Sequence, residues 1–317
     1  MKIVVTGGLG HIGSRLIRAL PDYFEDAEIV ILDDLSTQRF PSVFDLPSDA
    51  RYRFVEVDVT EADLAPYFSA ADAVVHLAAI VDAAGSFDRK AEVERVNLTA
   101  TRRVAEAAAM AGAGMIFPSS TSVYGTQEAT VDEDCPEDDL KPQSPYAETK
   151  LREENLLREM AAASGLRCVI CRFGTIFGIS PGMRFHTAVN KFCWQAVMGQ
   201  PLTVWSTAYE QMRPYLDVGD AVRAIALIIE SGHFDGGVYN VLTANATVSD
   251  VVEAIRVRVA DIEVSFVDAP IMNQLSYEVS DARFRRLGFV PEGELAAGIA
   301  ETVTLLERAN SARTHSP

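Results

Sequence analysis

The chain has 317 residues, of which 48% are hydrophobic, and it carries a formal net charge of −17 at pH 7. A chain of this length can bury a substantial core, in one large domain or in two closely packed ones. The negative charge argues against nucleic acid or an anionic membrane surface as the main partner, but it leaves room for a small anionic ligand in a locally positive pocket.

The sequence shows no feature typical of a membrane protein or a disulfide-stabilised protein. Its first residues lack a signal pattern, and the apolar stretch 221–229 is too short to cross a bilayer. Cys168 and Cys171 lie in an apolar run typical of a strand, where residues three apart point to opposite faces. We therefore expect a cytoplasmic protein with neither a disulfide framework nor a metal site.

The first half of the chain alternates short β-branched runs with helical stretches. The predicted strands are residues 2–6, 28–33, 52–57, 73–79, 115–119 and 167–173, and the clearest helices are 93–111 and 146–163. Repeated strand–helix–strand units predict an α/β fold, a doubly wound parallel sheet of the Rossmann type with helices on both faces. The carboxyl ends of its strands then meet at one edge, where ligands bind.

The regular alternation ends near residue 178. Predicted helices 185–198, 217–230, 248–257 and 294–308 are mixed with predicted strands 237–241 and 263–267. This pattern indicates a smaller C-terminal α/β lobe. We place the Rossmann domain at 1–178 and the smaller lobe at 179–317, with some C-terminal segments returning to the first domain.

The run TGGLGHIG, residues 6–13, follows the first predicted strand, and three of its four glycines have the spacing of a phosphate-binding turn. Gly7 permits a tight turn, Gly10 lets a pyrophosphate approach the backbone, and Gly13 allows a helix to pack closely on the strand. The free N–H groups and the dipole at the start of that helix attract phosphate. Such a turn also arises for purely structural reasons, so its position between a strand and a helix is what favours a dinucleotide site.

Asp33 lies 20 residues after Gly13, at the end of the second predicted strand. A carboxylate there accepts hydrogen bonds from a ribose diol and repels a 2′-phosphate, which favours NAD over NADP. The neighbouring Asp34 adds to that repulsion, and Asp58 and Val59 are placed to meet the adenine. The alternative for Asp33 is an ordinary loop or helix-capping aspartate.

Tyr146 and Lys150 are four residues apart at the start of a predicted helix and therefore share one face. A phenol with a pKa near 10 is a poor base at neutral pH, but a neighbouring ammonium and a positive nicotinamide ring favour the phenolate. Hydroxyl groups in the run SSTSVYG, residues 119–125, lie at the end of a preceding strand and can hold a substrate oxygen. The alternatives are a surface helix and a serine-capped turn.

These motifs together resemble the extended short-chain dehydrogenase/reductase family, which comprises NAD-dependent nucleotide-sugar epimerases and dehydratases. The matching stretches are residues 6–13 (TGGxGxIG), 75–79 (HLAA), 97–101 (NVxGT), 119–125 (SSxxVYG), 146–150 (YxxSK), 172–178 (RxxNxxG) and 213–218 (RxYxxV). They follow the order of the family and cover nearly the whole chain.

The resemblance implies roles for individual residues. Tyr146 would be the catalytic base, Lys150 would hold the nicotinamide ribose and tune Tyr146, and Ser120 would bind the sugar hydroxyl. The implied NAD site comprises Gly7, Gly10, His11, Ile12, Gly13, Asp33, Asp34, Leu35, Asp58, Val59, Leu77, Ala78, Ala79, Asn97, Tyr146 and Lys150. The implied substrate site comprises Ser120, Thr121, Tyr146, Thr175, Arg184, Asn190 and Arg213, of which Arg213 would grip the nucleotide diphosphate.

Three positions depart from the family pattern. Dehydratases carry an acidic residue before VYG, where this chain has Thr121 and Ser122. Thr175 replaces the usual asparagine, and a second diphosphate arginine expected near Ile271 is absent. The missing acid favours an epimerase, because elimination of water from carbon needs a general acid or base of that kind.

The leading hypothesis is NAD-dependent epimerisation of a UDP-sugar or another nucleotide sugar, at C4, through a transient ketone. The alternatives are a nucleotide-sugar reductase or dehydrogenase, a 4,6-dehydratase, and a non-catalytic NAD-sensing scaffold. The resemblance also implies a homodimer built on the alanine-rich helices 93–111 and 146–163. The alternative there is that both helices are simply buried against the sheet.

Overall fold

The computed structural model of the chain describes residues 1–81, 85–124, 130–142, 144–267 and 276–311. Its largest element is a sheet of seven strands in the order β11-β7-β5-β4-β1-β2-β3, in which every neighbouring pair is parallel. The strands are β1 (Lys2–Thr6), β2 (Glu28–Asp33), β3 (Arg51–Glu56), β4 (Ala73–His76), β5 (Gly114–Ser120), β7 (Cys168–Phe173) and β11 (Val238–Val241). The predicted doubly wound sheet is confirmed.

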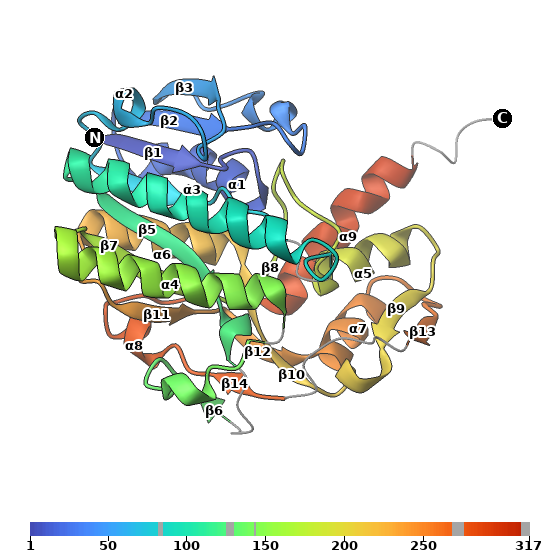
Figure 1. Cartoon of the computed structure of the whole chain (residues 1–317). Helices are drawn as coiled ribbons and strands as arrows, with labels where there is room; N and C mark the ends of the chain where they lie inside the picture. Colours follow the sequence, from blue (N-terminus) through green and yellow to red (C-terminus); the bar gives the residue numbers. More distant parts are fainter. Residues whose placement is uncertain (82–84, 125–129, 143, 268–275, 312–317) are drawn as a thin grey trace.

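Helices cover both faces of this sheet (Figure 1). One face carries α2 (Ala65–Phe68), α3 (Lys90–Ala111) and α4 (Pro145–Ser164), and the other carries α1 (His11–Tyr23), α6 (Val218–Ser231) and α8 (Ala282–Arg285). The alternation of side chains along a strand divides the core accordingly. Along β1, Val4 packs in the cluster with α3, whereas Ile3 and Val5 pack in the cluster with α1 and α6.

The chain after residue 177 builds most of a smaller lobe, which Figure 1 shows beside one end of the large sheet. Strands β8 (Thr175–Phe177), β10 (Met212–Asp217) and β12 (Ala244–Thr247) form a sheet, and β9 (Leu202–Trp205) pairs with β13 (Val264–Val267). Strands β6 (Thr130–Val131) and β14 (Glu278–Val279) make a further pair. Helices α5 (Ala188–Val197), α7 (Val248–Arg256) and α9 (Leu295–Ser311) share one hydrophobic core with the lobe.

Short 3₁₀ turns complete the secondary structure: η1 (Phe40–Val43), η2 (Thr121–Val123), η3 (Glu137–Asp139) and η4 (Ser206–Ala208). No helix in the described parts of the chain is both long and apolar enough to cross a membrane.

Several bounds of the fold differ from the sequence-based expectations, two of them near the predicted site. The predicted strand 73–79 ends at His76. The backbone N–H of Leu77 still donates to the backbone oxygen of Thr6, but that of Ala78 donates to the Thr6 side chain, at Oγ1. The predicted helix 185–198 begins only at Ala188. Strand β11 pairs with β7 in the large sheet, although it follows residue 178 in the chain. The boundary at residue 178 itself stays a prediction.

Candidate functional site

The last residues of four strands lie at one edge of the parallel sheet: Thr6 ends β1, Asp33 ends β2, His76 ends β4 and Ser120 ends β5. Strands that run in the same direction bring their carboxyl ends together, which is where open α/β sheets bind ligands. The site is therefore assembled from segments that are far apart in the sequence.

The glycine turn between β1 and α1 leaves no room for a side chain at Gly7 or Gly13. Gly7 has a φ of +67°, and a Cβ there would lie 2.6 Å from the backbone nitrogen of Ala78. A Cβ on Gly13 would lie 2.7 Å from the carbonyl oxygen of Gly7, whereas one on Gly10 would meet that oxygen only at 3.3 Å. The turn is thus a tight backbone loop at the start of α1, and its N–H groups suit an anionic ligand.

Asp33 links the end of β2 to the glycine turn. Its Oδ2 accepts from Leu9 N at 3.1 Å and its Oδ1 accepts from Leu35 N at 3.1 Å. Burial raises the pKa of the Asp33 carboxyl, and these two backbone N–H groups oppose the rise. A carboxylate has about four acceptor positions, so Asp33 retains capacity for a ribose diol.

The other residues predicted to meet the adenosine part lie on the loops after β2 and β3. Asp34 accepts from Ser36 N at 2.9 Å and Asp58 accepts from Thr60 N at 2.7 Å, so each carboxylate shapes its own turn. Leu35 has a φ of +55°, and Val59 is buried. The structure thus brings both loops to the carboxyl ends of β2 and β3, beside Asp33.

A segment of the smaller lobe, residues 178–187, lies across the start of α1. His11 Nε2 is 2.9 Å from Gly178 O, and Gly182 N donates to Ser14 Oγ at 2.9 Å. A Cβ on Gly182 would lie 2.2 Å from Leu9 O, so the two backbones touch. Burial lowers the pKa of His11 to about 4, with the nearby Arg184 also lowering it, so the imidazole is neutral at pH 7. Ile12 packs against the core on this face of the sheet.

The loop after β4 is held by the predicted Asn97 of α3. Its Oδ1 accepts from Ile80 N at 2.9 Å, and its Nδ2 donates to Ile80 O at 3.1 Å. This pair of bonds fixes the course of the chain just after Leu77, Ala78 and Ala79. Asn97 therefore orients that loop beside the glycine turn.

The hydroxyl-rich segment after β5 forms the short turn η2. Ser120 Oγ accepts from Ser122 N at 3.2 Å and lies 2.8 Å from Ser122 Oγ. Thr121 Oγ1 donates to Phe173 O at 3.3 Å, and Tyr277 OH donates to Thr121 O at 3.2 Å. Ser120 is thus fixed but partly exposed, whereas Thr121 is buried and its hydroxyl is occupied. Gly125 of this motif lies outside the described residues.

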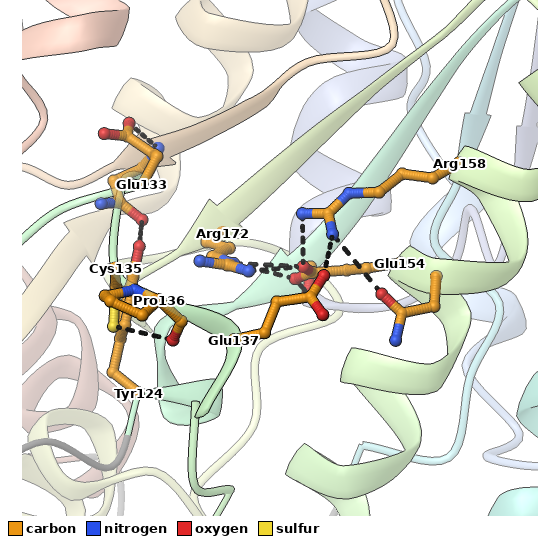
Figure 2. A network of polar contacts seen from close by, with 11 residues as sticks. Tyr124, Glu133, Cys135, Pro136, Glu137, Glu154, Arg158 and Arg172 are labelled. Atoms are coloured by element: carbon orange, nitrogen blue, oxygen red, sulfur yellow. Dashed lines mark hydrogen bonds and ion pairs between the residues drawn. The ribbon is translucent and has the colours of Figure 1, made fainter. Parts of the chain in front are cut away.

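A buried ion pair between Glu154 and Arg172 lies next to this segment, and Figure 2 shows its polar contacts. The Glu154 carboxylate of α4 accepts hydrogen bonds from Arg172 Nη2 of β7 at 2.7 Å and from Ser119 Oγ of β5 at 2.5 Å. The Arg172 guanidinium also lies over the Tyr124 ring, at 4.9 Å from its centroid. The sequence pattern around Lys150 and Arg172 did not reveal this network, because its partners come from three separate elements.

Tyr146 and Lys150 lie on the same face of α4, as predicted. Ser144 caps the helix by accepting from Ala147 N at 3.1 Å, and Ser86 Oγ accepts from Tyr146 N at 3.3 Å. The Lys150 ammonium lies 6.0 Å from the centroid of the Tyr146 ring and 4.3 Å from that of Phe117 in β5. Lys150 is buried, while Tyr146 is partly exposed.

The electrostatics around Tyr146 differ from the simple expectation that Lys150 favours its phenolate. Burial raises the pKa of the Tyr146 phenol, and the charge of Glu153 raises it further. The group that lowers it is Arg184, from the segment that also flanks His11. Without additional positive charge from a ligand, the phenol stays protonated at neutral pH.

The remaining predicted substrate residues come from the smaller lobe. Asn190 is fully buried, donating to Arg184 O at 3.2 Å and accepting from Gly178 N at 3.3 Å, so it orients residues 178–187. Arg213 of β10 is half-buried, donates to Gln211 Oε1 at 2.5 Å and lies 5.6 Å from the Tyr277 ring centroid. Thr175 opens β8, the strand next to β10. Position 271 lies outside the described residues, and Arg283 pairs with Asp134 instead.

This arrangement fits a bound dinucleotide. The backbone at Gly7 and Gly13 has no space for a Cβ, and the partly buried Asp33 keeps free acceptor positions at the adjoining strand end. Tyr146, Lys150 and Ser120 then supply a phenol, an ammonium and a hydroxyl at the same sheet edge. Such a set can transfer a proton to or from a substrate oxygen while a hydride is transferred at carbon.

Comparison with known proteins agrees with this geometry. The model of the NAD dependent epimerase/dehydratase family matches residues 3–241. The chain is 30% identical to UDP-glucose 4-epimerase of Mycolicibacterium smegmatis over 313 residues, which are 96% of this chain and 97% of that protein. It is also 30% identical to dTDP-glucose 4,6-dehydratase of Streptomyces niveus over 320 residues, 96% of this chain and 92% of that protein.

The crystal structure of UDP-glucuronic acid 4-epimerase from Bacillus cereus, in complex with UDP-glucuronic acid and NAD, superimposes with a TM-score of 0.87 at 25% identity. The match covers 98% of this chain and 100% of that one. Fold, motifs and site geometry lead to one conclusion: the chain belongs to the NAD dependent epimerase/dehydratase family.

Proposed function

We propose that the protein is an NAD-dependent epimerase that inverts C4 of a UDP-sugar. The observation that carries this proposal is that Tyr146 and Lys150 lie on one face of α4, with Lys150 Nζ 4.3 Å from the ring centroid of Phe117 in β5, the strand that ends at Ser120. The names of similar proteins support it, since UDP-sugar 4-epimerases are among them at full length.

The proposed reaction divides the work between cofactor and protein. The glycine turn and Asp33 would hold NAD, which would supply the hydride chemistry at the sugar carbon. Tyr146 takes the proton of the C4 hydroxyl and gives a proton back to the same oxygen after the ketone has turned over. Lys150 supplies positive charge next to the phenol, and Ser120 holds the sugar oxygen. No external oxidant is consumed, so the cofactor would stay bound through the cycle.

We further propose that the diphosphate of the substrate binds the smaller lobe. Arg213 offers a guanidinium suited to a phosphate oxygen pair, and Arg184 adds positive charge near Tyr146. Thr175, Asn190 and Thr121 would shape the pocket around the sugar. The predicted NAD contacts at His11, Ile12, Asp34, Leu35, Asp58, Val59, Leu77, Ala78, Ala79 and Asn97 remain part of this proposal.

The residues near η2 favour an epimerase over a dehydratase. Loss of water from a 4-keto sugar needs a group that removes the C5 proton and one that protonates the leaving hydroxyl. The positions before Val123 hold Thr121 and Ser122, which have no carboxyl group, and the Thr121 hydroxyl is engaged with Phe173 O. Dehydratases are also among the similar proteins, so a dehydratase is the second candidate to be tested.

The reaction is tested by supplying the purified, NAD-loaded protein with UDP-glucose and with UDP-glucuronic acid. We expect conversion to the C4 epimer, seen by chromatography and by the proton NMR couplings at C4, without accumulation of NADH. A 4-keto-6-deoxy product would assign a dehydratase. Stoichiometric NADH with an oxidised sugar would assign a dehydrogenase, and either result contradicts the proposal.

We also propose that the protein is a cytoplasmic homodimer formed through α3 and α4. The two helices are held to each other by ion pairs, Lys90–Glu148 at 2.6 Å and Arg152–Glu94. The exposed residues of these two helices include Met110 of α3 and the small residues 162 and 163 of α4. Light scattering at micromolar concentration should give twice the mass of one chain, and a monomer there contradicts this interface.

A further inference from the structure

A continuous chain of buried polar contacts runs from the loop after β4 to the Lys150 ammonium. Ala78 N donates to Thr6 Oγ1 at 3.3 Å, and Thr6 Oγ1 lies 2.7 Å from His76 Nδ1. His76 Nε2 lies 3.1 Å from Thr101 Oγ1, which donates to Glu153 Oε1 at 2.5 Å. The other oxygen, Glu153 Oε2, is 3.3 Å from Lys150 Nζ. The four side chains between Ala78 and Lys150 are at most 2% exposed.

The Glu153 carboxylate sets the direction of the hydrogen bonds that link it, through Thr101 and His76, to Thr6. An ionised Glu153 only accepts, so the Thr101 hydroxyl donates to it and in turn accepts from His76 Nε2–H. His76 Nδ1 is then unprotonated and accepts from the Thr6 hydroxyl. Burial lowers the pKa of His76 to about 3, and the Lys150 charge lowers it further, so the ring is neutral as this assignment requires.

The Lys150 ammonium lies near both the Glu153 carboxylate and the Tyr146 phenol. Tyr146, Lys150 and Glu153 are spaced four and three residues apart, so they form a stripe along one face of α4. The ammonium is 3.3 Å from the Glu153 carboxylate but 6.0 Å from the centroid of the Tyr146 ring. Among the described residues, Glu153 Oε2 has no hydrogen bond, so this ion pair is its one polar contact.

We propose that Glu153 is a positioning residue for the reaction: held by Thr101 and His76, its carboxylate fixes the Lys150 ammonium and weakens the positive field that Lys150 exerts on the Tyr146 phenol. The meaning of this for catalysis rests on the proposed function. A reversible epimerase uses the tyrosine as a base in one half-reaction and as an acid in the other. A phenol that ionises too easily would be a poor acid.

Several charged groups around this stripe affect the electrostatic potential at Tyr146 and Glu153. On α4 they are Lys150, Glu153 and the neighbouring Glu154, whose carboxylate is committed to Arg172. From the other elements Arg184 acts on Tyr146, and the neutral His76 faces Glu153 through Thr101. Burial also raises the pKa of Glu153, while Lys150 and the Thr101 hydroxyl oppose that rise and favour the ionised form.

The test follows ionisation of Tyr146 in the NAD-loaded protein without any sugar. The phenolate is measured by its ultraviolet absorbance, as the difference between each protein and its Tyr146→Phe counterpart. In Glu153→Gln no carboxylate neutralises the charge of the Lys150 ammonium. We therefore expect the Tyr146 phenolate to form about one pH unit lower than in the wild type. The matched control is Glu154→Gln, the same change one position on, which should lower the melting temperature without moving this titration.

Two results would overturn the proposal. One is that folded Glu153→Gln shows no phenolate at lower pH than the wild type, and the other is that Glu154→Gln shifts the titration equally. If Glu153→Gln does not fold, Glu153→Asp keeps the charge but shortens its reach. It should then bind NAD roughly tenfold more weakly, because Lys150 is less well fixed. An unchanged NAD affinity of Glu153→Asp would count against the proposal. None of these measurements depends on epimerase activity, so a failed sugar assay leaves them readable.

Discussion

Replacement of Tyr146 by phenylalanine is expected to lower kcat by about 10³-fold, within the usual range for loss of a general acid–base group. The phenol is the group on α4 that we propose to move a proton at the substrate oxygen. Its ring would remain, so the packing at the start of the helix should be preserved. Steady-state kinetics with the UDP-sugar, together with NAD titration of the variant, measures both expectations.

The matched control is Tyr52→Phe, which also removes one phenol hydroxyl. Tyr52 OH donates to Ile17 O at 3.0 Å, on β3 and away from the site. Its loss should cost about 1 kcal/mol of stability and leave kcat near the wild-type value. If Tyr146→Phe keeps more than about a tenth of the wild-type kcat, contrary to the usual loss of a proton-transfer group, the tyrosine is not the base. If it loses NAD as well, the loss of activity is not specific to proton transfer.

Replacement of Arg172 by methionine is expected to lower the free energy of unfolding by about 3–5 kcal/mol. Arg172 and Glu154 are both buried, and their atoms approach to 2.7 Å (Figure 2). Without the guanidinium, the Glu154 carboxylate stays in the interior, and its remaining partners among the described residues are Ser119 and the distant Arg158. Denaturant unfolding, analysed at constant m-value, gives the change directly.

Two variants separate this effect from general damage to α4. Arg158→Met removes a half-exposed guanidinium 3.9 Å from the same carboxylate, and such a pair should contribute at most about 1 kcal/mol. The double variant Arg172→Met/Glu154→Leu removes both charges and should be more stable than Arg172→Met alone. If the double variant loses as much unfolding free energy as Arg172→Met and Glu154→Leu lose together, the network stabilises the protein through its packing rather than through its charge pairing.

Local sequence was sufficient to predict the strands of the first half, the glycine turn and the helix that carries Tyr146 and Lys150. Apolar alternation, turn residues and i, i+4 spacing depend on near neighbours in the chain, so they can be read without the fold. The parallel sheet follows from those units, because strands joined by crossover helices run in one direction. The chemistry proposed for Tyr146 rests on this local information together with the family motifs.

Tertiary structure alone decided which distant residues meet. Strand β11 lies beside β7 although most of the intervening chain forms the other lobe, and Gly182 touches the backbone of Leu9 from 173 positions away. Glu153 shows the limit most clearly: its spacing from Lys150 is visible in the sequence, but Thr101 and His76 come from another helix and a strand. A buried polar group must find a partner wherever the packing places one, and that choice depends on the whole fold rather than on local sequence.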